Sequence, residues 1–504
     1  MTKPRSSSYF RSQEAPKAPK PGAPFERKPA RPAAATASAN RKPKPPDSRP
    51  GKPFGAPPVS GNVPRRPQPK AAVAKGPSRP AGPGPMKSPG AMISRRAADR
   101  LRDGYLWVYA SDIESINVPN ADHPPALLPV ADSRGLLLGT ALYSPASQIP
   151  LRMVSREALD EPAWLELLAA RLRTAIGRRR VFLDQGTDAA RLCFSEADEL
   201  PGLIIDKYGS QVVLQLLTRG LDSDAIREAC VRVLREELAP AAILERPDPR
   251  VRELEGLSAP NLAPLFVQGD FSQDESAAPA TTHFLLNGLR LEYDASAGQK
   301  TGAFLDQRDN YAATRQWAER LGLPGRESGG RALDICCYQG GFALHLAQVC
   351  GQVTGIDASH ASLEVAERNF AANREAMKAE VDWVAGDAFQ VLRDWSDAGE
   401  KFDAIVLDPP AFAKTQRAVE GALRGYKELN LRALKMLTPG GLLVTCSCSH
   451  HVSWTDLEGS VAAAAADAGR RVRLLERRGA ALDHPVVLNL PETEYLKCLV
   501  LEVE

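Results

Sequence analysis

The sequence RALDICCYQGGF, residues 331–342, joins an apolar run to a pair of glycines, and this join is typical of a strand that turns into a helix. Gly340 and Gly341 let the backbone approach a ligand closely where the helix begins. The pattern is not G-x-G-x-x-G, and it lacks the lysine and Ser/Thr of a P-loop. Neither a nicotinamide dinucleotide site nor a P-loop ATPase is therefore well supported.

The C-terminal two hundred residues alternate between strand-like and helix-like segments. The strand-like runs are RALDIC (331–336), QVTGID (352–357), VDWVAGD (381–387), FDAIVLD (402–408), GLLVTCS (441–447), VRLLE (472–476) and YLKCLVLEV (495–503). Helix-like segments such as SLEVAERNFAANREAM and YKELNLRALKML lie between them. This alternation predicts a mostly parallel, doubly wound α/β sheet with helices on both faces. Ligands bind such sheets beyond the carboxyl ends of the strands.

Four of these runs close on an aspartate, namely Asp334, Asp357, Asp387 and Asp408. One acidic residue at a strand end is often only a turn or helix-cap residue, but four in consecutive strands favour a site. Asp357 lies 23 residues beyond Asp334, about one βαβ step, where a carboxylate accepts hydrogen bonds from a ribose diol. Asp387 is placed to meet an adenine amino group. The set fits S-adenosylmethionine, whose cationic sulfonium also favours nearby carboxylates.

The first 85 residues differ in composition from the rest of the chain. They hold 21 of the 42 prolines, with 9 Lys and 9 Arg against 3 acidic residues, a net charge of +15. Because the whole chain carries +3, the remainder carries −12. Such a segment cannot bury enough apolar surface to offset its ordering entropy, so a disordered tail is predicted over residues 1–85. Its charge suits a polyanion, although a merely solubilising extension is equally open.

Three folded segments are expected after the tail. Residues 86–155 show short period-two runs broken by Gly and Pro, which predict a small β-barrel with an arginine cluster at Arg95, Arg96, Arg100 and Arg102. Residues 156–295 mix helix and strand patterns and predict an α+β middle domain. Residues 296–504 contain the doubly wound sheet. The sequence shows no run of 18 apolar residues and no secretory signal, so a cytoplasmic enzyme is expected.

Two cysteines and two histidines end the stretch GLLVTCSCSHHV, residues 441–452, which begins as an apolar run. Eight cysteines at irregular spacing in a long chain predict reduced thiols. The group at Cys446, Cys448, His450 and His451 is open to three interpretations: a metal site, a nucleophile, or ordinary core cysteines. A zinc site usually takes paired ligands from two separate elements, and no second pair appears, so no metal is expected.

Several separated motifs resemble one enzyme family. They are TGAFLDQRDN (301–310), DICCYQGGF (334–342), LDPPAF (407–412), RGYKELN (424–430), SCS (447–449) and DHPVVLNLPETEYLK (483–497). In this order they resemble class I methyltransferases and, among these, the bacterial family that makes 5-methylcytosine in large-subunit (23S) ribosomal RNA. The resemblance covers residues 88–504. It implies an N-terminal PUA domain that binds structured RNA, a middle domain and a Rossmann-like catalytic domain that uses S-adenosylmethionine.

The chemistry of that family needs one thiol. Carbon 5 of cytosine is a poor nucleophile until a thiolate adds to carbon 6, and cysteine can both attack and leave. Cys448 matches the cysteine of the SCS motif and is the expected nucleophile, whereas Cys446 is expected to pack or to support it. Asp408 is expected to hydrogen-bond the polar edge of the base, but the base that removes the carbon 5 proton stays unassigned.

The other expected site residues fall into two groups. Cofactor contacts are expected from the glycine loop, the strand-end acids and the segment before the first strand: Asp334, Tyr338, Gly340, Gly341, Asp357, Asp387, Asp306, Gln307 and Arg308. Lys300 is expected near the cofactor or the RNA. Contacts to RNA are expected from the D-P-P loop that begins at Asp408, which its two prolines stiffen, and from the segment after it. The residues are Pro409, Pro410, Phe412, Lys414, Arg424 and Lys427.

Three rival functions remain open from the sequence. D-P-P followed by an aromatic residue is the hallmark of methyltransferases that act on guanine or adenine nitrogens, which need no thiol. A non-catalytic RNA-binding assembly factor could retain the same fold, and a nicotinamide oxidoreductase is disfavoured by the glycine pattern. The sequence does not fix the modified nucleotide, whether the substrate is free RNA or an assembling subunit, or whether the chain is a monomer or a homodimer.

Overall fold

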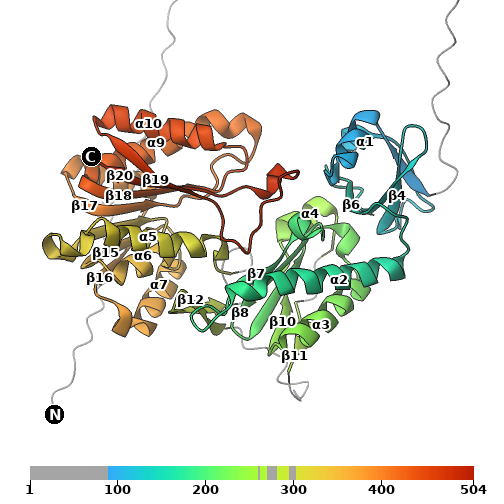
Figure 1. Cartoon of the computed structure of the whole chain (residues 1–504), viewed down its shortest axis with the longest axis horizontal. Helices are drawn as coiled ribbons and strands as arrows, with labels where there is room; N and C mark the ends of the chain where they lie inside the picture. Colours follow the sequence, from blue (N-terminus) through green and yellow to red (C-terminus); the bar gives the residue numbers. More distant parts are fainter. Residues whose placement is uncertain (1–88, 259–261, 269–280, 295–301) are drawn as a thin grey trace, which may run out of the picture. The chain divides into compact units, whose positions relative to one another are not determined.

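The computed structural model describes residues 89–258, 262–268, 281–294 and 302–504 (Figure 1). The predicted basic tail over residues 1–85 lies outside the described residues, and so does Lys300.

The first folded segment is a six-stranded sheet with one helix. Its strands are β1 (Gly90–Ile93), β2 (Trp107–Val108), β3 (Ile113–Asn117), β4 (Leu127–Asp132), β5 (Leu137–Tyr143) and β6 (Leu151–Ser155), in the order β2-β6-β5-β4-β1-β3. Helix α1 (Arg95–Arg102) begins at Ser94, whose hydroxyl accepts a hydrogen bond from the Ala97 amide. The predicted arginine cluster is partly neutralised, because Arg100 pairs with Asp112 and Arg102 with Asp132.

The second segment is a five-stranded sheet with flanking helices. Its strands are β7 (Ala190–Phe194), β8 (Leu203–Tyr208), β9 (Gln211–Leu216), β10 (Ala242–Glu245) and β11 (Phe266–Val267), in the order β11-β10-β9-β8-β7. The helices are α2 (Glu161–Arg179), α3 (Asp224–Leu238) and α4 (Pro249–Glu255). The hairpin predicted around Tyr208 is confirmed, since β8 and β9 pair antiparallel. A separate hairpin follows, made of β12 (Thr281–Leu286) and β13 (Leu289–Asp294).

The third segment holds a seven-stranded sheet in the order β16-β15-β14-β17-β18-β20-β19. The strands are β14 (Arg331–Ile335), β15 (Gln352–Asp357), β16 (Glu380–Ala385), β17 (Phe402–Leu407), β18 (Leu437–Ser447), β19 (Val472–Arg478) and β20 (Lys497–Val503). The first five in the spatial order are parallel to one another, whereas β20 is antiparallel to both β18 and β19. All seven predicted strands are present, and the prediction of a mostly parallel sheet is confirmed.

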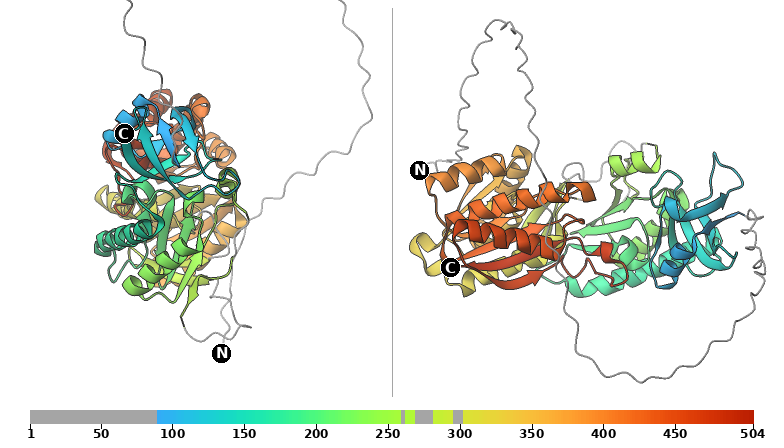
Figure 2. Two further views of the ribbon diagram at one scale, coloured as in Figure 1. Left: turned by 90° about the vertical axis from the view of Figure 1, so that its right-hand side faces the viewer. Right: turned by 90° about the horizontal axis from the view of Figure 1, so that it is seen from above.

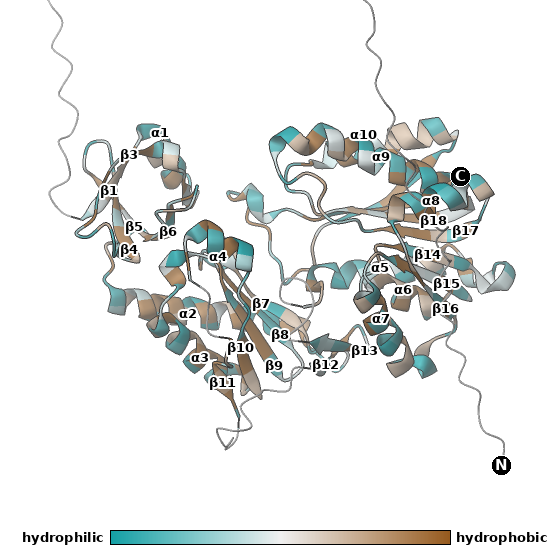
Figure 3. Cartoon of the chain, turned by 180° about the vertical axis from the view of Figure 1, so that it is seen from behind, coloured by the Kyte–Doolittle hydropathy of each residue, from teal (hydrophilic) through white to brown (hydrophobic). Residues whose placement is uncertain are grey.

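Helices cover both faces of this sheet. They are α5 (Arg308–Arg320), α6 (Gly341–Ala347), α7 (His360–Ala372), α8 (Ala388–Ala398), α9 (Val419–Met436) and α10 (Trp454–Ala468). Alternate residues of β14 face opposite sides: Ala332 packs in a cluster with α5 and α6, while Leu333 and Ile335 pack with α9 and α10. Helices α9 and α10 run side by side on their face (Figure 2). Apolar residues gather on the strands, where both sheet faces are buried (Figure 3).

Candidate active site

The loop between β14 and α6 has an unusual backbone. Two non-glycine residues, Cys336 and Tyr338, have positive φ angles of 63° and 50°, and Gly340 follows at 88°. Such conformations cost of order 1–3 kcal/mol each for a residue with a side chain and collect at ligand sites. A Cβ atom on Gly341 would lie 2.3 Å from the Tyr311 ring, so only glycine fits there. The predicted close approach of this loop to a ligand therefore has a backbone basis.

Asp334 lies inside β14 and not at its end, which differs from the sequence interpretation. Its Oδ2 accepts a hydrogen bond of 2.8 Å from the amide of Ala343 in α6. Burial, together with the charges of Asp408 and Asp357, raises the pKa of this carboxyl well above its usual range, despite the Ala343 amide. Oδ1 is buried and has no hydrogen-bond partner within the described part of the chain. A buried carboxyl with one oxygen that has no hydrogen-bond partner among the described residues thus stands behind the glycine loop.

Asp357 and Asp387 occupy the next two strand ends. Asp357 ends β15, and its two oxygens accept hydrogen bonds of 2.9 Å from the amides of Tyr338 and Ser359. It therefore fixes the glycine loop while its carboxylate stays partly exposed. Asp387 follows β16, is exposed, and caps α8 by accepting from the Gln390 amide at 3.0 Å. Asp357 is thus bound to the loop, whereas Asp387 stands at the next strand end as a helix cap.

The segment before α5 connects the site to the last part of the chain. The Tyr495 hydroxyl donates to Asp306 at 2.5 Å, and Gln307 donates to Asp408 at 3.0 Å. The Gln307 oxygen in turn accepts from Asn310 at 2.6 Å. Both Asp306 and Gln307 are buried, so Asp408 is held in place by a side chain that is itself fixed.

Arg308 points elsewhere than the sequence interpretation expected. Its guanidinium pairs with Asp309 at 3.0 Å and with the buried Asp483 at 3.1 Å, and it lies over the Phe182 ring. Because Asp483 also accepts from the Arg191 amide at 2.9 Å, this cluster joins α5, β7 and the segment before β20. Arg308 is therefore engaged in holding these segments together.

Cys448 follows β18 directly and is partly exposed. Its Sγ lies 3.9 Å from the carbonyl oxygen of Pro409, which places the thiol against the D-P-P loop. The residues on either side of it are pinned, since Ser447 donates to the Tyr426 hydroxyl at 2.8 Å and Ser449 lies 3.1 Å from the same oxygen. Ser449 also accepts from the Ala413 amide at 3.2 Å. The thiol-bearing turn, residues 447–449, is thus hydrogen-bonded to both α9 and the D-P-P loop.

Cys446 differs from Cys448 in its burial and in its partner. It is fully buried and lies opposite Cys498 in the β18–β20 pair. A hydrogen bond with Cys498 and burial raise the pKa of the Cys446 thiol well above its usual value. Of the two cysteines, only Cys448 is placed to react with a molecule from outside.

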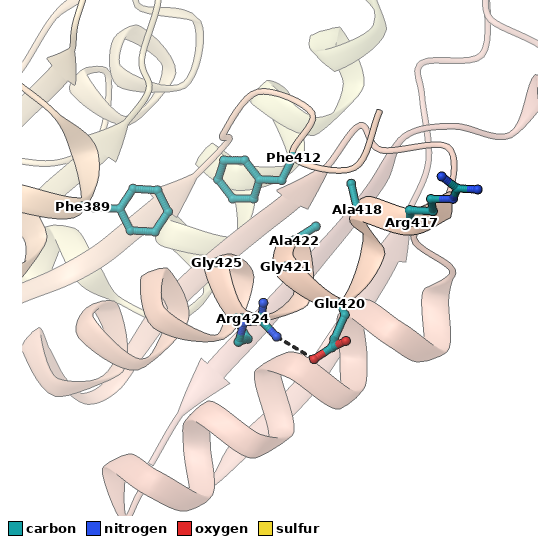
Figure 4. A pocket seen from close by; sticks show the side chains of 9 residues that line it. All are labelled: Phe389, Phe412, Arg417, Ala418, Glu420, Gly421, Ala422, Arg424 and Gly425. Carbon is teal, nitrogen blue, oxygen red and sulfur yellow. Dashed lines mark hydrogen bonds and ion pairs between the residues drawn. The ribbon is translucent and has the colours of Figure 1, made fainter. Parts of the chain in front are cut away.

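Phe412 lies between two other aromatic rings. Its centroid is 4.9 Å from that of Tyr426 and 5.8 Å from that of Phe389. Together with part of α9 these phenylalanines line an open pocket of about 520 Å³, in which the two rings lie side by side and Arg417 is on the other side (Figure 4). This pocket adjoins the loop that carries Asp408, and Phe412 contributes to its wall.

The three expected RNA-binding cations lie on or near α9. Lys414 is exposed in the loop before that helix. Arg424 pairs with Glu420 at 2.6 Å (Figure 4), and Lys427 pairs with Asp467 at 2.7 Å. Both pairs are solvent-exposed and therefore weak, so these cations can exchange partners at little cost. Pro410 is exposed at the tip of the loop, while Pro409 is buried.

Lys497 and Tyr426 belong to the site but were not singled out from the sequence. Lys497 is buried, and its Nζ donates to the carbonyl oxygens of Ser449 and Tyr495 at 3.1 and 2.9 Å. Tyr426 fixes both serines that flank Cys448. Both residues lie within motifs that carry the family resemblance, and only this position in the sequence could have indicated them.

The described residues contain neither a metal-binding cluster nor a membrane-spanning helix. No group of three or more His, Cys, Asp or Glu side chains among them could hold a metal ion. Within the same ranges, no helix has the length and apolar character needed to cross a membrane.

Two family models and several curated relatives match the chain. A family model described as a PUA-like domain matches residues 92–156, and one described as a methyltransferase domain matches residues 326–479. A curated relative from Erwinia tasmaniensis, named ribosomal RNA large subunit methyltransferase I, is 37% identical over 394 residues, covering 78% of this chain and 93% of its own. A relative of the same name from Escherichia coli O127:H6 is 38% identical over 372 residues, covering 73% and 88%.

Solved structures share the fold. One, described as a methyltransferase complexed with SAH, has a TM-score of 0.67 at 20% identity and covers 82% of this chain and 100% of its own. Another, from Streptococcus mutans and described as SAM-dependent, has a TM-score of 0.66 at 19% identity with the same coverage. The predicted architecture, a PUA-like domain followed by a doubly wound methyltransferase domain, is confirmed.

Proposed function

Because the chain belongs to the ribosomal RNA large subunit methyltransferase I family, we propose that it transfers a methyl group from S-adenosylmethionine to carbon 5 of a cytosine in 23S ribosomal RNA. The reaction proceeds through a covalent adduct with Cys448. In this proposal residues 86–155 bind structured RNA in the cytoplasm, residues 156–295 form the middle domain, and residues 296–504 carry the chemistry.

The observation that carries the proposal is the thiol at the end of β18. Methyl transfer to a base nitrogen needs no thiol, whereas transfer to carbon 5 of cytosine does. Cys448 is partly exposed, lies 3.9 Å from the Pro409 carbonyl, and sits in a turn fixed on both sides by serine hydrogen bonds. Such rigidity suits a nucleophile that must meet one ring atom.

The residues around the glycine loop fit S-adenosylmethionine. Oδ1 of Asp334, which is buried and has no hydrogen-bond partner among the described residues, stands behind the glycine loop. In that loop, position 341 has room only for glycine. Asp357 and Asp387 provide acceptors at successive strand ends for the ribose and the adenine amino group, and Tyr338 lines the loop between them. When bound, the cofactor supplies an electrophilic methyl group. Asp306 and Asp408 add carboxylates to this region, which suits a cationic ligand.

In the proposed mechanism the Cys448 thiolate adds to carbon 6 of the cytosine, which makes carbon 5 nucleophilic. After methylation, loss of the carbon 5 proton expels the thiolate and restores the aromatic ring. Asp408, held by Gln307 at 3.0 Å, orients the base through its polar edge. Pro409 and Pro410 stiffen the loop, and Phe412 provides an aromatic wall beside it. Lys414, Arg424 and Lys427 bind phosphates of the RNA.

Trapping the adduct tests this proposal. In RNA containing 5-fluorocytidine, carbon 5 carries fluorine, which cannot leave as a proton does, so the enzyme should remain bonded to the RNA in the presence of S-adenosylmethionine. A denaturing gel should show the complex, and mass mapping should locate the bond at Cys448. With unmodified RNA, radiolabelled methyl should appear in 5-methylcytidine. If the labelled methyl group appeared on a base nitrogen, the result would favour a nitrogen methyltransferase of the same fold. If the protein bound SAH but transferred no methyl group, the result would favour a non-catalytic assembly factor.

Replacing Asp357 with alanine should weaken SAH binding about 10- to 100-fold. The carboxylate fixes the Tyr338 amide and is the proposed ribose acceptor, and hydrogen bonds to charged groups contribute about 1.5–3 kcal/mol each. Titration calorimetry measures the change. Asp394→Ala, which removes an exposed carboxylate on α8, is the control and should leave SAH affinity unchanged. Equal affinities for the wild type and Asp357→Ala would remove Asp357 from the cofactor site.

A further inference from the structure

A buried ammonium group lies beside the thiol-bearing turn. Lys497 is 3% exposed, and its Cα pairs with that of Ser447 across the β18–β20 strand pair. Its Nζ donates to the carbonyl oxygen of Ser449 at 3.1 Å and to that of Tyr495 at 2.9 Å. Lys497 therefore contacts the chain on both sides of Cys448. Because burial of an ammonium group costs free energy, packing alone does not explain a lysine at this position.

Within the described ranges, two charged groups act on this ammonium. Burial lowers the pKa of Lys497, while the charges of Glu494 and Cys448 act to raise it. Glu494 accepts from the Trp454 indole at the exposed edge of the site. On the other side, Cys448 faces the carbonyl of Pro409 and the phenol of Tyr426, and burial and the Cys448 charge both raise the pKa of Tyr426. Neither the carbonyl nor the neutral phenol carries the positive charge that a thiolate needs.

We propose that Lys497 is a positioning residue for the reaction: its ammonium holds the turn that carries Cys448 and stabilises the thiolate form of that side chain. This inference rests on the proposed function and deepens it. When the thiolate forms, the S–H bond breaks, both electrons stay on sulfur, and the proton passes to solvent water, so no further reactant is needed. An ammonium within electrostatic range favours the anion and so increases the fraction of reactive thiolate at neutral pH.

The test is the pH dependence of Cys448 alkylation by iodoacetamide in the full-length protein, followed by mass mapping of the peptide that contains Cys448. In the wild type the thiol should titrate below the value of about 8.5 for free cysteine. In Lys497→Met the titration should move up by about one unit, and alkylation at pH 7 should slow about tenfold. The difference should shrink in the alkaline range, where the wild-type ammonium loses its proton and the variant thiol ionises.

Two further variants control the result. Lys401→Met makes the same substitution at an exposed lysine that donates to the Lys435 carbonyl near the start of β17, and it should leave alkylation of Cys448 unchanged. Lys497→Arg keeps the charge and should keep the thiol pKa closer to that of the wild type. For methyl transfer, Lys497→Met should lower kcat while the KM for S-adenosylmethionine stays constant, which a general loss of structure would not do.

The same thiol pKa in the wild type and Lys497→Met would overturn the inference, as would a wild-type thiol that titrates at or above 8.5. If Lys497→Met does not fold, the wild-type titration and Lys497→Arg still decide. The alkylation requires no RNA, so it separates this inference from the proposed function. A lysine-dependent thiol without a cytosine adduct would leave the inference standing and remove the function.

Discussion

Cys448→Ala is expected to lose methyl transfer to ribosomal RNA by roughly 10⁴-fold or more, which is the scale on which enzymes lose rate when a catalytic nucleophile is removed. Without addition at carbon 6, carbon 5 of cytosine remains part of an aromatic ring and does not attack the methyl group. Cys446, two residues away, cannot replace it, because Cys446 faces Cys498 in the buried core. Transfer of radiolabelled methyl under single-turnover conditions measures the loss.

The control is Cys446→Ala, which deletes a thiol two residues away. That variant should retain transfer within about tenfold and lose stability instead, since it leaves a small cavity in the core. Binding of SAH should be the same in Cys448→Ala and the wild type, because the glycine loop and Asp357 are untouched. An active Cys448→Ala enzyme would mean that the D-P-P loop alone supports the chemistry, as in nitrogen methyltransferases.

The second large effect is expected from Asp483→Ala, which should lower the free energy of unfolding by about 3–5 kcal/mol. Among the described residues, the variant leaves the buried Arg308 guanidinium with Asp309 as its one remaining carboxylate partner, and it removes the acceptor of the Arg191 amide. It also removes the carboxylate that faces His484 at 3.0 Å. Urea denaturation followed by tryptophan fluorescence measures the change. Asp382→Ala, at an exposed position of β16, should change stability by less than about 0.5 kcal/mol.

The same carboxylate gives stability a pH dependence. Burial alone would raise the pKa of Asp483, but the hydrogen bond and charge of His484, the charge of Arg308 and the Arg191 amide lower it overall. A carboxyl whose folded pKa is below its unfolded value stabilises the fold above the unfolded value of about 3.9, and this contribution is lost as the pH falls through the folded value. Asp483→Asn should therefore show a smaller loss of stability on acidification than the wild type.

The strands could be predicted because buried parallel strands are continuous apolar runs, which are easily seen in a sequence. All seven runs proposed for the last sheet are strands in the structure. The exact end of a strand is harder to predict, and Asp334 shows the effect. With β14 ending at Ile335, its carboxyl lies behind the glycine loop instead of at the open edge.

Partners across long sequence distances could not be predicted. Arg308 stands next to Gln307 in a motif assigned to the cofactor, yet its partner Asp483 is 175 residues away. Lys497 looks like the polar start of an ordinary strand, and only the β18–β20 pairing brings it to Cys448. Sequence patterns report the local environment of a residue, whereas these roles depend on which strands become neighbours.

The position of β20 between β18 and β19 also has a kinetic meaning. The hydrogen bond from Tyr495 to Asp306 spans 189 residues, and that from Gln307 to Asp408 spans 101. Contacts of this span form late, because closing long loops costs entropy before any contact repays it. During folding, Gln307 is therefore expected to orient Asp408 only after contacts of shorter span have formed. The candidate site should therefore be completed late in folding, when segments far apart in the sequence come together.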